Sequence, residues 1–249
     1  MRLGPLWKLR QPAAAHTLAT VETETAKTAA QPPAIAPGRA AGAEPSAVPV
    51  QTLPAEIANI DRMDWDELGH AVIDCRRCGL CAARKQAVLG IGDRRADWLF
   101  VGEGPGAEED ERGEPFVGQA GKLLDNMLLA IDLRRGEDVY IANAVKCRPP
   151  ANRTPEAEEI AACRPYLQRQ IALLRPKLIV ALGRPAAQAL LQSEIKIAAA
   201  RGRLHDLDGI PVIVTYHPAY LLRNLPDKAR AWEDLCLMRR TMRELKTSE

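Results

Sequence analysis

A short apolar run at residues 98–101 (WLFV) ends abruptly in the glycine-rich segment 102–106 (GEGPG). An unbroken apolar run of this kind is typical of a strand buried on both faces of a parallel sheet. Open α/β sheets place their ligand sites in the loops after the carboxyl ends of such strands, and glycine lets the backbone approach a ligand closely. Many strand-to-helix turns carry glycines and bind nothing, so this segment alone leaves a ligand site and an ordinary turn equally open.

Three more apolar runs, at about residues 139–143, 178–182 and 211–215, alternate with helical segments along the chain. This alternation predicts an α/β fold with a parallel sheet covered by helices on both faces. All but the third of the four strands end in a polar loop that carries glycine or proline. Because the carboxyl ends of parallel strands meet at one edge, the residues that follow those three strands, Glu103, Asn143 and His217, are expected to converge there.

The helical segments are expected at about residues 64–73, 119–131, 154–174, 185–192 and 228–246. Apolar residues three and four positions apart mark the one that begins at about 119. Thr154 is the expected N-cap of its helix, with Pro155 at the first helical position. Pro165 is expected to kink or restart that helix.

The chain has a formal net charge of only +2, which does not by itself indicate a nucleic-acid partner. Residues 1–54 are rich in alanine and proline and lack periodicity, which predicts a disordered tail before a folded domain at 55–249. Trp7 in this tail is either incidental or part of a short peptide that docks a replication or repair protein. No signal peptide or membrane-spanning run is found, so we expect a cytoplasmic protein. We also expect it to be a monomer.

Six cysteines in a chain expected inside the cell point to metal or redox chemistry before structural disulfides. Cys75 and Cys78 form a C-x2-C pair, and Cys147 and Cys163 are able to complete a four-thiolate site. Four thiolates suit structural zinc or an iron–sulfur cluster. Cys81 extends the pair to the C-x2-C-x2-C spacing of ferredoxins. Spacing alone does not choose between these metals, and inert buried thiols are the plainest alternative.

His217 follows a strand and precedes the pair Leu221 and Leu222, with Arg223 next. Apolar side chains exposed in a basic loop suit a wedge inserted into a base stack, whereas leucines at the start of a helix ordinarily face the core. Basic residues gather after the strand ends, in an arrangement that suits either phosphate contacts or a solvated surface. These residues are Lys146, Arg148, Arg153, Arg201, Arg203, Arg223, Lys228 and Arg230.

Together these motifs closely resemble family 4, the iron–sulfur branch of the uracil-DNA glycosylases. The matching segments are Cys75-x2-Cys78-x-Leu80, GEGPG at 102–106, EPFVG at 114–118, NAVKCRPP at 143–150 with Asn152-Arg153, Cys163, Leu182-Gly183, and HPAYLLRN at 217–224. The resemblance covers about residues 60–245. It implies a three-layer α/β/α sandwich around a four-stranded parallel sheet. It also implies a [4Fe–4S] cluster on Cys75, Cys78, Cys147 and Cys163, with Cys81 a bystander.

The resemblance further implies that the chain removes uracil from DNA in base excision repair, leaving an abasic site. The base must leave the stack for its glycosidic bond to be reached. Phe116 would stack on the flipped uracil, and the Asn143 amide would pair with its O4 and N3–H, which cytosine does not match. His217 would donate a hydrogen bond to O2 of the departing anion.

The backbone of Gly104, Pro105 and Gly106 would assist His217 at the departing base. Leu221 would fill the gap left in the duplex, and Arg153 and Arg223 would contact DNA.

One assignment departs from the family pattern. Related enzymes carry an aspartate that positions water directly before the proline of the first motif, and Gly104 stands there instead. We hypothesise that Glu103 orients the water or the loop. One of the acids that follow, with Glu109 as the candidate, would exclude the 5-methyl group of thymine.

Two other classes of protein remain open from the sequence. The first is a non-catalytic iron–sulfur module that binds nucleic acid during replication, and the second is a zinc-stapled nucleotide hydrolase. The absence of a P-loop lysine motif weakens the second. A related branch traps uracil covalently through a histidine after the asparagine strand. Residues 152–155 (NRTP) hold no histidine, so we expect turnover without a covalent adduct.

Overall fold

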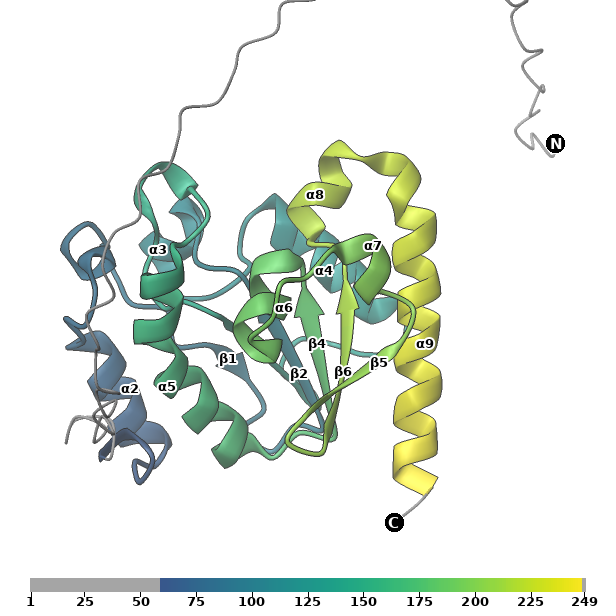
Figure 1. Cartoon of the computed structure of the whole chain (residues 1–249), viewed down its shortest axis with the longest axis horizontal. Helices are drawn as coiled ribbons and strands as arrows, with labels where there is room; N and C mark the ends of the chain where they lie inside the picture. Colours follow the sequence, from purple (N-terminus) through teal and green to yellow (C-terminus); the bar gives the residue numbers. More distant parts are fainter. Residues whose placement is uncertain (1–58, 248–249) are drawn as a thin grey trace, which may run out of the picture. The chain divides into compact units, whose positions relative to one another are not determined.

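The computed structural model describes residues 59–247 and centres on a six-stranded sheet in the order β1-β3-β2-β4-β6-β5 (Figure 1). The tail and the start of the folded domain predicted from the sequence lie outside these residues. The strands are β1 (Ile91–Gly92), β2 (Trp98–Gly102), β3 (Val139–Asn143), β4 (Leu178–Leu182), β5 (Leu204–Leu207) and β6 (Ile210–Thr215). The four predicted strands, β3-β2-β4-β6, are present and mutually parallel.

Two antiparallel edge strands extend this parallel centre, β1 beside β3 and β5 beside β6. Neither was predicted from the sequence. Strand β1 has two residues, too few to show any periodicity. Strand β5 is only half-buried, with Leu204 exposed and Leu207 partly buried, so it does not resemble the buried runs of the centre.

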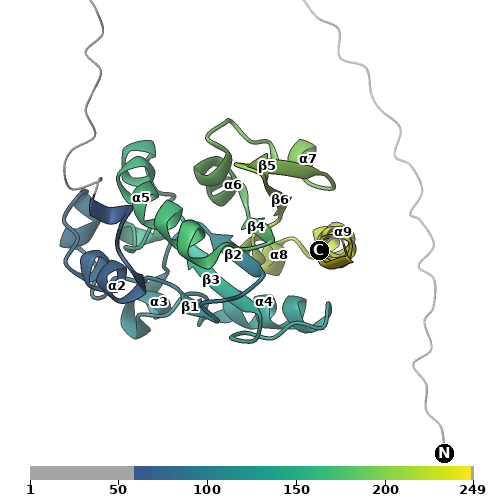
Figure 2. The ribbon, with the colours of Figure 1, turned by 90° about the horizontal axis from the view of Figure 1, so that it is seen from below.

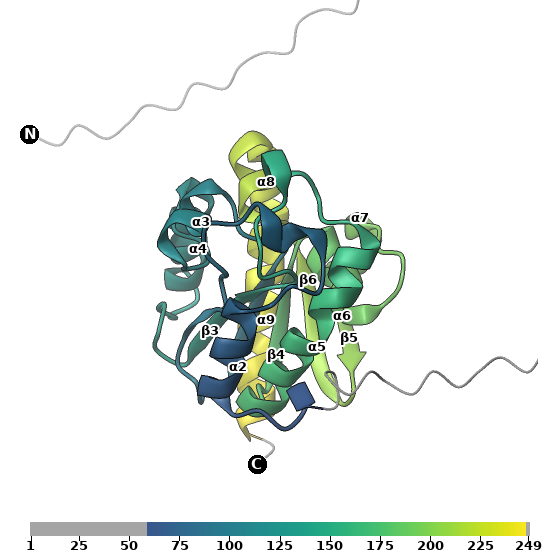
Figure 3. The ribbon, with the colours of Figure 1, turned by 90° about the vertical axis from the view of Figure 1, so that its left-hand side faces the viewer.

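The helices form the two outer layers of the sandwich. They are α2 (Trp65–Ile73), α3 (Ala107–Arg112), α4 (Gln119–Leu129), α5 (Ala157–Leu174), α6 (Arg184–Leu191), α7 (Ile197–Ala200), α8 (Pro218–Arg223) and α9 (Lys228–Thr247), with 3-10 turns at Gly79–Ala82, Pro150–Asn152 and Leu225–Asp227. Helices α4, α8 and α9 pack on one face of the sheet, and α5, α6 and α7 pack on the other (Figure 2). Helix α2 lies against α5 (Figure 3). The predicted three-layer α/β/α fold is therefore confirmed.

Successive residues of each central strand point alternately into the two hydrophobic cores, one on each face of the sheet. Phe100 and Val180 face α4 and α9, whereas Leu99 and Ile179 face α5 and α6. All five residues of β2, β3 and β4 are buried, as their unbroken apolar runs predict. None of the helices in residues 59–247 is long and apolar enough to span a membrane.

Helix α5 differs from the sequence prediction at its N-cap, and it does not restart at Pro165. Its N-cap is Glu156, not Thr154, because the Glu159 side chain accepts a hydrogen bond from the Glu156 N–H at 2.8 Å and closes a capping box. The helix also runs through Pro165 without restarting. Buried neighbours such as Cys163 and Tyr166 hold both sides of the proline in the core, which offsets the hydrogen bond it cannot make.

Candidate active site

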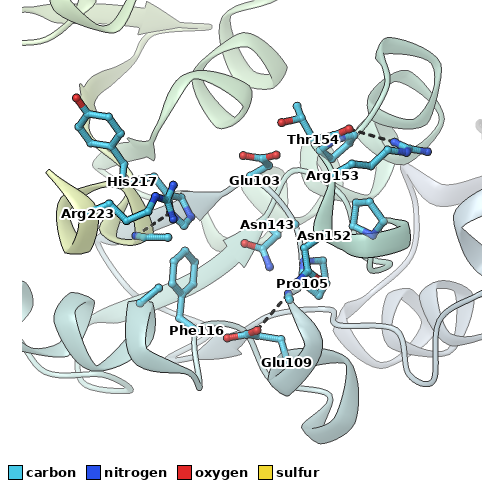
Figure 4. A pocket seen from close by; sticks show the side chains of 17 residues that line it. Glu103, Pro105, Glu109, Phe116, Asn143, Asn152, Arg153, Thr154, His217 and Arg223 are labelled. Atoms are coloured by element: carbon cyan, nitrogen blue, oxygen red, sulfur yellow. Dashed lines mark hydrogen bonds between the residues drawn. The ribbon is translucent and has the colours of Figure 1, made fainter.

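A cavity of about 500 Å³ opens at the carboxyl edge of the parallel strands (Figure 4). Its volume is that of a pocket for a small organic ligand. Glu103, Asn143 and His217 line it together, as the strand order predicts, because Gly102 pairs with Asn143 and Leu182 with Thr215 across the sheet. The other expected pocket residues that line it are Gly104, Pro105, Gly106, Glu109, Phe116, Arg153 and Arg223.

Asn143 ends β3 with its side chain buried, 2% exposed. Its Oδ1 has no hydrogen-bond partner among the described residues. Gly102 makes room for it, since a Cβ atom at Gly102 would lie 2.5 Å from Asn143 Oδ1 and 2.5 Å from Phe116 Cζ. A buried amide without a partner is costly, so its oxygen is free to accept a hydrogen bond from a bound ligand.

Phe116 faces this amide from a strained backbone position, with φ of 56°. Arg135 holds it there by donating to the carbonyl oxygens of Pro115 and Phe116 at 2.9 and 2.8 Å, while Asp125 pairs with the guanidinium. Gly121 is required below it, because a Cβ at that position would lie 1.8 Å from the Phe116 oxygen. The ring is therefore a fixed stacking surface beside Asn143.

His217 caps α8 and presents its imidazole beside Phe116, with the ring centroids 5.5 Å apart. Its Nδ1 accepts a hydrogen bond from the Ala219 N–H at 3.1 Å, which leaves Nε2 as the donor. Burial lowers the pKa of His217 to about 4, with Arg223 lowering it further and Glu109 opposing the shift. The imidazole is therefore a neutral donor at physiological pH.

Glu103 is a partly buried carboxylate on the wall of the cavity. Burial raises the pKa of Glu103, against the opposing effects of a hydrogen bond from Thr154 and the charge of Arg184. The next position, Gly104, has little room for a side chain, because a Cβ there would lie 2.7 Å from Val145 Cγ2. The carboxylate at this point of the wall therefore belongs to Glu103 and not to position 104.

Glu109 lines the cavity, but its carboxylate is occupied by the backbone. Its Oε2 accepts from the Gly106 N–H at 3.1 Å, and its Oε1 accepts from the N–H groups of Val117 and Gly118 at 2.9 and 3.1 Å. These bonds tie the glycine-rich loop to the segment that carries Phe116. They indicate that Glu109 shapes the pocket, and they also engage the Gly106 N–H that was expected to face a departing anion.

The structure contradicts the prediction that Leu221 is an exposed wedge. Its side chain is 1% exposed and packs in the core beneath α8 with residues of α4 and α9 such as Met127 and Leu235. The next residue, Leu222, is 42% exposed. The core-facing alternative is correct for Leu221, since a helix turns one of two adjacent leucines inward and the other outward.

The two arginines expected to contact DNA differ. Arg153 makes a bidentate ion pair with Glu159, at 2.8 and 2.7 Å, and is therefore held by the protein. Arg223 is exposed at the rim of the cavity, and no ion pair to it is found in residues 59–247. Two other residues of the basic set fit neither phosphate contacts nor a solvated surface, because Lys146 is fully buried and the Arg201 side chain pairs with buried Asp234.

Three residues that sequence reasoning did not single out also line the cavity: Asn152, Thr154 and Tyr220. All three belong to or directly follow motif segments already quoted, at 143–153 and 217–224. Tyr220 stacks on Tyr216 with ring centroids 5.2 Å apart and donates to Asp227 at 2.7 Å. Their position in or beside those segments is the sequence signal that indicates a place in the pocket wall.

A second, smaller cavity lies between α2, the turn after it, the loop after β3 and α5, and the expected cysteines line it together. Cys75, Cys78, Cys147 and Cys163 line it, and so does Cys81. Burial raises the pKa of the Cys163 thiol to about 12. Within the described chain, no group of three or more His, Cys, Asp or Glu side chains is arranged to hold a metal ion. The five cysteines share one cavity.

Cations surround this cysteine cavity. Arg77 and Lys146 line it, and Arg84 donates to the Cys147 sulfur at 2.9 Å. The Nη1 atom of Arg77 is buried and has no hydrogen-bond partner in the described part of the chain. Of the residues found to line the cavity none is an aspartate or glutamate. Thiol donors and uncompensated cations fit a thiolate-ligated, anionic metal group.

Comparison with known proteins gives the class of this fold and site. A model of the uracil DNA glycosylase superfamily matches residues 89–236, and the chain belongs to that superfamily. It is 42% identical over 184 residues to a type-4 uracil-DNA glycosylase of Pyrobaculum aerophilum, covering 70% of this chain and 93% of that protein. It is 49% identical over 158 residues to one of Thermotoga maritima, covering 63% and 82%. Within the superfamily, the chain belongs to the type-4 uracil-DNA glycosylases.

Proposed function

We propose that this chain is a uracil-DNA glycosylase of base excision repair, which flips uracil out of DNA and hydrolyses its N-glycosidic bond. The buried Asn143 amide supports this most directly, because its Oδ1 lacks a partner in a cavity of nucleobase size. Carboxamide nitrogen and oxygen match uracil O4 and N3–H, and cytosine presents the opposite pattern at both positions. A site built on such a pair discriminates strongly, because the wrong base leaves buried polar groups unpaired.

Uracil is held between fixed groups before the bond breaks. Phe116 supplies the stacking surface, and its backbone is clamped by Arg135. Bond cleavage leaves negative charge on the base, and the neutral His217 donates from Nε2 to O2 where that charge develops. Because Gly106 donates to Glu109 and Pro105 has no N–H, any backbone help from this loop comes from Glu103 and Gly104.

Water attacks the sugar from the side of Glu103. A carboxylate there orients the water and stabilises the cationic character that builds up on the sugar. Glu109 excludes thymine indirectly, by fixing the distance between the glycine-rich loop and Phe116. Residues 152–155 hold no histidine for covalent capture, so the reaction ends in release of uracil and an abasic site without a covalent adduct.

Type-4 enzymes are typically iron–sulfur proteins, and we propose a [4Fe–4S] cluster on Cys75, Cys78, Cys147 and Cys163. The four thiols on one cavity and the cations around it support a thiolate-bound anionic group. Both zinc and an iron–sulfur cluster accept four thiolates, and membership of the type-4 family favours the cluster. When bound, the cluster supplies structural cross-linking between α2, α5 and the loop after β3. Cys81 lines the same cavity and stays a bystander in this proposal.

Arg223 is the proposed phosphate contact at the pocket rim, and Leu222 replaces Leu221 as the exposed side chain able to enter the duplex. A monomeric state, a cytoplasmic location and a tail that docks a replication or repair protein stay predictions.

The experiment that tests the proposed function is excision by anaerobically purified protein. Single-turnover assays use oligonucleotides with uracil opposite guanine, opposite adenine and in a single strand. Release of uracil with an alkali-labile abasic site supports the proposal. Binding of these DNAs without base release would favour the non-catalytic iron–sulfur module, and a colourless protein with stoichiometric zinc would exclude the cluster.

A further inference from the structure

Lys146 is a fully buried cation whose hydrogen-bond partners are neutral. Its side chain is 1% exposed, and its Nζ donates to the Asn143 carbonyl oxygen at 2.8 Å and to Gln170 Oε1 at 2.5 Å. Burying an ammonium group is costly unless an opposite charge lies close to it. Neither a carbonyl nor a carboxamide supplies that charge.

The surroundings of Gln170 fix the direction of this contact. The Gln170 NH₂ group donates to the Leu89 carbonyl oxygen at 2.9 Å, so its oxygen faces Lys146. Gln170 is itself 0% exposed. Lys146 is therefore held between α5 and the end of β3, and its ammonium anchors the backbone of the residue that reads uracil.

The cysteine cavity lies on the other side of Lys146. Lys146 is among the residues that line this cavity, its backbone N–H donates to the Cys163 sulfur at 3.2 Å, and its ammonium is close enough to Cys163 and Cys147 to interact with their charges. No carboxylate is among the residues that line the cavity. The negative charge that balances a buried ammonium here is therefore that of thiolates bound to a metal group.

We infer that Lys146 is a positioning residue that joins the two sites, with its ammonium serving both as counter-charge to the cluster and as the anchor of the Asn143 backbone. This inference rests on the proposed function, and in particular on a cluster bound by the four cysteines. It gives the cluster a defined influence on uracil recognition that requires no redox chemistry.

The test compares Lys146→Met with Arg84→Met in cluster-loaded protein. Both variants remove a cation beside the thiols, but Arg84 contacts Cys147 and the Ile73 carbonyl and does not touch Asn143. Two quantities are measured: the inhibition constant of free uracil in the excision assay, and the reduction potential of the cluster by spectroelectrochemistry. Purely structural damage to the pocket would leave the potential unmoved.

Both variants are expected to shift the potential to more negative values, because a cation near the cluster favours the reduced state. Only Lys146→Met is expected to weaken inhibition by uracil, by about tenfold, the effect of losing one charge-assisted hydrogen bond. The inference is overturned if Lys146→Met leaves either quantity unchanged, or if Arg84→Met weakens uracil inhibition equally.

A second variant covers the case in which Lys146→Met does not fold. Gln170→Met removes one anchor of the ammonium and keeps its charge, so uracil inhibition is expected to weaken while the potential stays the same. Unchanged inhibition in this variant overturns the inference. Failure of the proposed function itself has a different signature, since wild-type protein would then lack iron or excise no uracil.

Discussion

The uracil pocket and the cysteine site share the segment at residues 143–147, yet the protein stabilises them differently. In the pocket, protein groups hold the recognition residues in place: Arg135 clamps Phe116, Glu109 clamps the glycine-rich loop, and the Ala219 N–H fixes the tautomer of His217. The cysteine site is a cavity with raised thiol pKa values and cations that lack counter-charges. The first is preorganised by the chain itself, and the second is the site that we propose a bound cluster completes.

The largest effect is expected from a substitution that disrupts the cysteine site and leaves the side chains of the pocket unchanged. Cys147→Ala removes a buried ligand, so we expect loss of the iron and sulfide content of the purified protein together with a marked fall in its melting temperature. Cys236→Ala is the matched control, because that thiol lies on α9 and is not among the residues lining the cavity. Full iron content in Cys147→Ala would contradict the proposed ligand set.

The next largest effect is expected from a substitution that disrupts the pocket and leaves the cysteine site intact. Asn143→Ala removes the amide that pairs with uracil and is expected to slow single-turnover excision by about 10³-fold with unchanged iron content. Asn152→Ala is the control, since that amide lines the rim and accepts a hydrogen bond from Arg148 at 2.7 Å. Equal losses in the two variants would show that the buried amide has no special function.

Glu103→Gln sharpens the chemistry within the pocket and is expected to slow excision by about 10²-fold. Both Glu103 and His217 must be deprotonated, so the rate falls as the pH falls through their pKa values. In the wild type, the pH below which the rate begins to fall is set by Glu103, because burial raises the pKa of that carboxyl group. In the variant only His217 remains, and the acid limb is expected to move down toward pH 4. Near-full activity in Glu103→Gln would refute its part in orienting water.

The smallest effect separates the two arginines at the rim. Arg223→Gln is expected to weaken DNA binding several-fold. It is also expected to reduce the magnitude of the slope of log affinity against log salt concentration by about one, the amount that corresponds to one phosphate contact. Arg153→Gln breaks the ion pair with Glu159 and is expected to lower the melting temperature without changing that slope. Titrations at several salt concentrations distinguish them, and the opposite pattern would restore Arg153 as the phosphate contact.

The sequence predicted the four parallel strands and the convergence of Asn143, His217 and Glu103. Both predictions rest on local signals, namely unbroken apolar runs and the polar residues that follow them. It missed β5, whose apolar residues lie partly on the surface. It assigned Leu221 to DNA and placed Lys146 among the basic residues of the surface, although both are buried. Which of two leucines turns inward, and which cation is enclosed, depends on contacts with α4, α9 and α5 that are distant in sequence.

The partners of Arg153 and Glu109 could not be predicted for a related reason. Glu109 bonds the backbone of residues 117 and 118, across the loop that carries Phe116, and Arg153 finds its carboxylate one turn into α5. Charge and spacing mark such residues as polar and near the site. Only the folded backbone decides whether they face a ligand or hold the loop that does.

The most direct measurement is single-turnover excision by the iron-loaded protein on matched duplexes with uracil, thymine or cytosine opposite guanine. The preorganised pocket predicts release of uracil, and no detectable release of cytosine or thymine over the same period. Release of cytosine at a comparable rate, or no release of uracil from protein with a full complement of iron, would contradict the account.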